Sequence, residues 1–170
     1  ADNVKSVYAA DVNGDGEMDV LSASYHDEIV WYENAEGYTY VPDDNFEQAL
    51  VDLGYDSEVD DLVLTENISG VTSLDVASKG ISDLTGIEDF TQLEVLSCRV
   101  NQLTSLNVSN NTELTNLSCD QNQITSLDVS NNLDLDRLFV GWNQLTSLDV
   151  SSNTALERLY ADNNSLTTLD

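Results

Sequence analysis

LEVLSCRVNQLTSLNVSNNTE, residues 93–113, decides the fold, because the same pattern returns without a gap to the end of the sequence. The later copies are LTNLSCDQNQITSLDVSNNLD (114–134), LDRLFVGWNQLTSLDVSSNTA (135–155) and the partial LERLYADNNSLTTLD (156–170). A constant period of 21 residues is typical of a solenoid, in which each repeat forms one coil and stacks on its neighbour. The C-terminal half of the chain is therefore predicted to be a solenoid.

Leucine and asparagine occupy fixed positions in these copies. Alternate residues of a short strand point to opposite faces, so the leucines should be buried between coils. Asparagine amides at the corners should hydrogen-bond the backbone groups that each bend leaves unpaired. The columns are Leu93, Leu114, Leu135 and Leu156; Leu96, Leu117, Leu138 and Leu159; Asn101, Asn122, Asn143 and Asn164; and Asn111, Asn132 and Asn153.

On these columns the chain resembles bacterial leucine-rich repeats, in particular the nested 21-residue subclass called IRREKO. The resemblance implies a mainly β leucine-rich-repeat solenoid. The upstream stretch VTSLDVASKGISDLTGIEDFTQ (71–92) fits one 22-residue unit, with Lys79 at the asparagine position. Residues 71–170 are therefore expected to form the repeats, the last of them incomplete.

A short amphipathic helix is expected before the repeats, in VPDDNFEQALVDLG (41–54). Asp43 and Asp44 are candidates for the N-cap, and Gly54 is a candidate for the C-cap. Apolar residues at helical spacing lie between them: Phe46, Ala49, Leu50 and Leu53. Because an uncapped solenoid exposes its core, residues 42–70 are predicted to form a helical N-terminal cap, preceded by a linker over 35–41.

The first 34 residues do not share the repeat period. They predict three short antiparallel strands, at roughly 6–10, 19–24 and 28–33, around the loop DVNGDGEMD (11–19). Side-chain oxygens recur in this loop at short spacing, as calcium requires. An EF-hand is disfavoured, because its twelfth position would need a bidentate glutamate and here holds Ser22.

The stretch VYAADVNGDGEMDVLSASYHDEIVWYEN (7–34) resembles one unit of the FG-GAP or VCBS type, a calcium-binding propeller blade. The resemblance implies calcium as the cofactor, bound by Asp11, Asn13, Asp15 and Asp19 together with the carbonyl of Glu17. Residues 1–34 are therefore predicted to be a calcium-binding β unit; the alternative is an acidic turn without metal. A single blade leaves unpaired strand edges, so a longer native chain or a pairing partner is expected.

Outward-facing positions on the first strand of each repeat vary, while the rest of the repeat scarcely changes. Arginines and aromatic residues gather there, and such residues carry much of the binding energy in known interfaces. The predicted contact site for a protein or a glycan consists of Arg137, Phe139, Trp142, Arg158 and Tyr160. The alternative is that the aromatic side chains merely cover the sheet.

Two further columns have structural and functional interpretations. The column Asn107, Asp128, Asp149 and Asp170 predicts either a solvated acidic face or, less favoured, a ladder of bound calcium ions. Cys98 and Cys119 occupy the same inward position in neighbouring coils. They are expected to be buried thiols, with a disulfide between coils as the less favoured alternative.

The charge of the chain excludes several classes of partner. Its 32 acidic and 5 basic residues give a formal charge of −27, which disfavours nucleic acid, because nucleic-acid affinity depends on Lys and Arg. No apolar run approaches the roughly 18 residues of a membrane span. His26 is the single histidine, and no combination of residues forms a catalytic constellation, so a non-enzyme is predicted.

These features together predict a non-catalytic binding or adhesion module, secreted or on the cell surface, which recognises protein or carbohydrate through the strand face of the solenoid. One alternative is a structural subunit that self-associates head to tail into an extracellular filament. Another is the non-catalytic arm of a larger secreted enzyme.

Overall fold

The computed structural model describes residues 6–10, 19–23, 29–32 and 37–169. The chain divides into two compact units, Ala1–Tyr38 and Thr39–Asp170. Each unit is described by itself.

The first unit contains a three-stranded antiparallel sheet in the order β1-β2-β3. Its strands are β1 (Ser6–Ala10), β2 (Asp19–Ala23) and β3 (Ile29–Tyr32). The register pairs Ser6 with Ala23, and Ala23 with Ile29. Every end of these strands lies within one residue of its predicted position. The likeness to a propeller blade stays a prediction.

The second unit begins with a small sheet and a helix. Strand β4 (Tyr38–Tyr40) pairs with β5 (Leu62–Leu64), and helix α1 (Asp44–Leu53) lies between them in the chain. A short helix, α2 (Thr65–Ile68), follows β5. Strand β4 lies inside the segment expected to be a linker, because Thr39 and Val41 are buried and belong to the packed interior of this unit.

Helix α1 occupies the stretch predicted to be helical, and its ends have clear local causes. The carboxylate of Asp43 accepts hydrogen bonds from the backbone N–H groups of Asn45 and Phe46, at 3.0 and 3.1 Å. Gly54 ends the helix in the left-handed conformation, with φ of 81°, which glycine adopts without steric cost. Phe46 and Leu50 are fully buried in the same apolar cluster as the first leucines of the solenoid.

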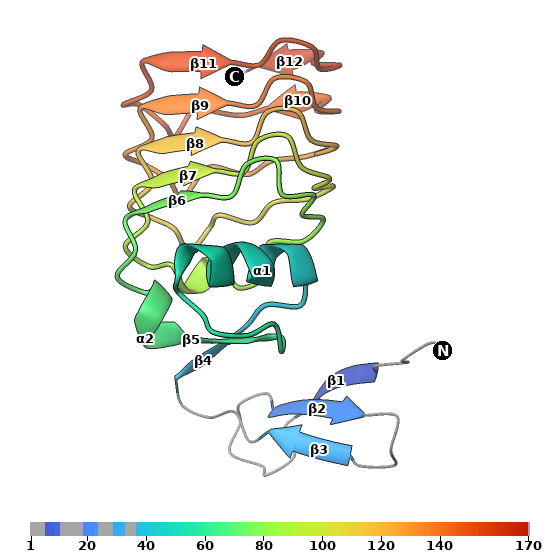
Figure 1. Cartoon of the computed structure of the whole chain (residues 1–170). Coiled ribbons are helices and arrows are strands. Elements are labelled where there is room, and N and C mark those ends of the chain that lie inside the picture. Colours follow the sequence, from blue (N-terminus) through green and yellow to red (C-terminus); the bar gives the residue numbers. More distant parts are fainter. Residues whose placement is uncertain (1–5, 11–18, 24–28, 33–36, 170) are drawn as a thin grey trace. The chain divides into compact units, whose positions relative to one another are not determined.

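Five parallel strands form the main sheet of the solenoid, in the order β11-β9-β8-β7-β6, and Figure 1 shows them stacked coil upon coil. They are β6 (Ser73–Asp75), β7 (Val95–Ser97), β8 (Asn116–Ser118), β9 (Arg137–Phe139) and β11 (Arg158–Tyr160). A 3₁₀ turn, η1 (Ile87–Asp89), lies in the first coil. Strands β10 (Ser147–Leu148) and β12 (Thr168–Leu169) form a second, two-stranded parallel pair. The predicted solenoid is confirmed, with about four turns.

Leucine columns fill the interior of the coils, as the sequence predicts. Leu74, Leu96, Leu117 and Leu138 lie in register on successive strands, and all are buried. Burying one such side chain contributes about 1.5–3 kcal/mol. Cys98 and Cys119 are fully buried and free, so the expectation of two buried thiols is confirmed.

The asparagine columns tie each coil to the one before it. Nδ2 of Asn122 donates to the carbonyls of Cys98 and Cys119, each at 3.0 Å, while its Oδ1 accepts the backbone N–H of Leu103 at 3.0 Å. In the second column, Nδ2 of Asn132 donates to the carbonyls of Val108 and Asn111. The predicted role of these amides at the corners is confirmed.

Within the described residues, no helix has the length and apolarity that a membrane span requires.

Candidate functional site

The outward face of the parallel sheet carries the residues predicted to contact a ligand. The strand register aligns Arg137 with Arg158, and Phe139 with Tyr160. The rings of Phe139 and Tyr160 stack nearly parallel, with centroids 4.9 Å apart and an angle of 7° between their planes. This register therefore places two arginines beside each other and two aromatic rings beside each other.

Trp142 lies at the corner that follows this face. Four corner residues share a left-handed backbone, with φ of 56° at Val100, 57° at Gln121, 54° at Trp142 and 55° at Asn163. Such a conformation costs a non-glycine residue roughly 1–3 kcal/mol. Hydrogen bonds between coils hold it in place, among them the one from the Trp142 N–H to the Asp162 carbonyl at 2.9 Å. Trp142 is 58% exposed.

A hollow of about 260 Å³ is lined in part by these aromatic side chains. Three of the five residues predicted to contact a ligand line it, namely Phe139, Trp142 and Tyr160. Arg137 and Arg158 stand beside the stacked rings on the same two strands but do not line the hollow. The other lining residues are Arg99, Asp120, Gln121, Gly141 and Asp162.

Charged groups of both signs border the hollow. Nε of Arg99 lies 3.8 Å from Oδ2 of Asp120, and Asp162 lines the other side beside Gly141. A Cβ added at Gly141 would lie 2.9 Å from Oδ1 of Asp162, so the missing side chain makes room for that carboxylate. The site therefore combines an aromatic wall with hydrogen-bond donors and acceptors at its edge.

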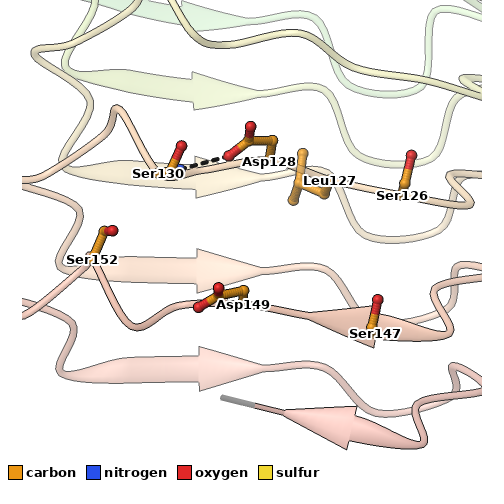
Figure 2. Close-up of a pocket in the computed structure, with 7 residues that line it drawn as sticks. All are labelled: Ser126, Leu127, Asp128, Ser130, Ser147, Asp149 and Ser152. Atoms are coloured by element: carbon orange, nitrogen blue, oxygen red, sulfur yellow. Dashed lines mark hydrogen bonds between the residues drawn. The ribbon is translucent and has the colours of Figure 1, made fainter.

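A second hollow, of about 400 Å³, lies over the acidic column. Figure 2 shows its lining, in which Asp128 and Asp149 come from adjacent coils, and the hydrogen bond between Asp128 and Ser130. Oδ1 of Asp128 accepts the backbone N–H of Ser130, and Oδ1 of Asp149 accepts that of Ser151, each at 2.9 Å. The lining residues are Ser126, Leu127, Asp128, Ser130, Ser147, Asp149 and Ser152.

These carboxylates close the turns that follow them. Hydrogen bonds from Ser130 lower the pKa of Asp128, and hydrogen bonds from Ser151 lower that of Asp149. Oδ1 of Asn107 accepts the N–H of Ser109 in the same way, at 3.1 Å, so three members of the column make the same hydrogen bond to the backbone of their turns. The fourth member, Asp170, lies outside the described residues.

The predicted calcium loop lies almost entirely outside the residues that the structure describes. Asp11, Asn13, Asp15 and Glu17 are outside them, and Asp19 is the first residue of β2. The calcium site at this loop therefore stays a prediction.

No family model matches the chain. Internalin J from Listeria monocytogenes serotype 4b (strain F2365) is 40% identical to it over 73 residues, which are 43% of this chain and 8% of internalin J. The solved functional domain of internalin J from L. monocytogenes matches 78% of this chain and 30% of its own, with a TM-score of 0.71 and 39% identity. The solenoid has the leucine-rich-repeat fold. The internalin J domain includes a cysteine ladder, and this chain likewise has cysteines at equivalent positions of two neighbouring coils.

A second solved internalin, InlF from L. monocytogenes strain 4b F2365, matches 76% of this chain and 43% of its own. The TM-score is 0.65 and the identity 28%. The chain thus spans less than half of each of these internalins. The similarity extends over the leucine-rich-repeat fold and does not identify a ligand for this chain.

Proposed function

We propose that this chain is a non-catalytic binding or adhesion module, secreted or held at the cell surface, whose strand face recognises a protein or a carbohydrate. The observation that carries this proposal is the hollow bounded by the stacked Phe139 and Tyr160 rings and by Trp142. Tyr160 and Trp142 are 53% and 58% exposed. Aromatic side chains clustered around a hollow are typical of binding hot spots.

The aromatic and charged side chains of the hollow could bind either a sugar ring or a basic side chain of a protein. A sugar ring would lay its apolar face on the aromatic wall and offer its hydroxyl groups to Asp120, Gln121 and Asp162. A basic side chain of a protein would stack on the same rings and pair with the two carboxylates. The likeness to internalins supports a leucine-rich-repeat scaffold for this surface.

Arrays of glycans and of extracellular proteins test the proposal and separate the two ligand classes. The wild-type chain should bind members of one array, and Trp142→Ala combined with Tyr160→Ala should abolish that signal. Leu133→Ala is the matched control, because Leu133 is as exposed as Trp142 but does not line the hollow. Equal signals from the wild type and the double variant would refute a role for the hollow.

The filament alternative predicts a different result. Sedimentation velocity at increasing protein concentration, with calcium present, should show a single monomeric species if the chain is a binding module. A series of growing oligomers would instead favour head-to-tail assembly.

We also propose a structural role for helix α1 and a calcium site in the loop 11–19. Helix α1 caps the first coil, supported by the contact between Phe46 and Phe90, whose ring centroids lie 6.4 Å apart. The loop 11–19 binds one calcium ion, supported by the spacing of its oxygen side chains. Calorimetric titration with calcium should lose one equivalent when Asp11→Ala and Asp15→Ala are combined, and an unchanged stoichiometry would contradict the loop site.

A further inference from the structure

Three carboxylates converge beside helix α1. Glu47 lies on the helix, and Asp56 and Asp60 lie in the segment between α1 and β5. One oxygen atom of each side chain lies within 4.8 Å of the others. The cluster therefore joins the helix to the segment that follows it.

Glu47 is fully buried, and only one of its carboxylate oxygens has hydrogen-bond partners. Oε1 accepts the backbone N–H groups of Asp60 and Leu62, each at 3.0 Å. Oε2 is buried without a partner, and so is Oδ2 of Asp56. Buried carboxylate oxygens are costly unless something pairs with them, so the arrangement calls for a ligand.

No basic side chain supplies the missing partner within residues 37–169. The ion pairs of this part of the chain join Lys79 to Asp52, Arg99 to Asp120, and Arg137 to Asp136. The charge of the cluster is therefore offset either by a cation or by a proton.

We propose that Glu47, Asp56 and Asp60 bind a calcium ion. Calcium prefers carboxylate and other oxygen ligands at about 2.3–2.6 Å, so two oxygens that share one ion lie up to about 5 Å apart, and the oxygens of the cluster lie within that limit. Its flexible geometry accepts a few side chains with water in the remaining positions. The ion would tie α1 to the segment that leads into β5, and so hold the helix over the first coil.

The test uses the full chain with Asp11→Ala and Asp15→Ala already present, so that the proposed loop 11–19 does not contribute. Calorimetric titration with calcium chloride should give one equivalent in this background. Adding Glu47→Gln or Asp56→Asn should weaken the binding at least tenfold. Glu58→Gln is the matched control, because it removes an equal charge from the same segment without touching the cluster, and it should bind calcium as the background does.

Three results would overturn the proposal. They are the absence of calcium binding in the background, equal binding by all variants, and equally tight binding of magnesium. A proton in place of the ion would show as thermal stability that depends on pH but not on calcium. Circular dichroism of each variant shows whether it has folded, and Asp56→Asn keeps the test decisive if Glu47→Gln does not fold.

Discussion

Single asparagine side chains stabilise the corners of the solenoid through hydrogen bonds to the backbone. The side chain of Asn122 makes its three shortest hydrogen bonds to backbone groups of two coils, and that of the equivalent Asn143 does the same one coil later. A buried backbone group that loses its partner costs about 1–3 kcal/mol. Each asparagine therefore stabilises the fold through the groups that it satisfies as well as through its own packing.

Asn122→Ala should lower the free energy of unfolding by about 2–3 kcal/mol, because the buried Leu103 N–H loses its partner and the carbonyls of Cys98 and Cys119 each lose one of two asparagine donors. Urea denaturation followed by circular dichroism measures the change. Asn110→Ala, at an exposed position without such bonds, should cost about 0.5 kcal/mol or less. Similar losses for both variants would contradict the assigned role.

The two thiols should not react in the native protein. Burial raises the pKa of Cys98 well above its ordinary value and that of Cys119 to about 12, and only the thiolate attacks a disulfide reagent. Titration with Ellman's reagent at pH 8 should detect no thiol in the folded chain and two after denaturation. Rapid labelling of the folded protein would show that the coils open.

At the scale of elements, the carboxylate of Asp43 makes hydrogen bonds both within helix α1 and to the first coil. Oδ1 of Asp43 caps the helix, while its Oδ2 accepts the N–H and hydroxyl of Ser82 and the N–H of Asp83. The same side chain thus starts the helix and attaches it to the first coil.

Asp43→Ala should cost about 2 kcal/mol, because it removes both the cap and the attachment. Asp44→Ala, an exposed acid in the first turn of the helix, should cost about 0.5 kcal/mol or less. Thermal or urea denaturation at neutral pH compares them. An equal cost for the two variants would show that the attachment contributes nothing.

The cost of Asp43→Ala should also depend on pH. Burial alone raises the pKa of Asp43, but the hydrogen bonds from Ser82, Phe46 and Asp83 outweigh it and hold the pKa below its usual value. The stabilisation is therefore complete above the unfolded value of about 3.9 and is lost as the pH falls through the lower folded value. The difference between wild type and variant should shrink in urea titrations below about pH 3.9, and a constant difference would contradict this linkage.

The elements that can be predicted from the sequence are those that a local signal determines, such as a helix cap or a constant repeat spacing. Asp43 and Gly54 mark the ends of α1, and the 21-residue spacing places the leucine and asparagine columns. The sequence predicts a linker over 35–41 and not strand β4. This strand forms by pairing with β5, which lies more than twenty residues later in the chain, and such pairing is not visible in the local sequence. The Glu47 cluster was missed for the same reason, since the path of the segment after α1 brings its members together.

At the scale of the whole molecule, the net charge is −27, and the chain has only five basic residues. Arg99, Arg137 and Arg158 all stand on the strand face, and Arg99 lines the hollow beside the aromatic side chains. Variation between repeats could predict Phe139, Trp142 and Tyr160. It could not single out Gly141 and Asp162, because their place in the hollow depends on how two neighbouring coils fit together.

The central claim is that this hollow on the strand face binds the ligand. The most direct measurement is the dissociation constant, by calorimetry, of a glycan or protein that the arrays identify. The Trp142→Ala and Tyr160→Ala double variant should bind at least a hundredfold more weakly than the wild type, while Leu133→Ala binds unchanged. A dissociation constant that is the same for all three proteins would contradict the claim.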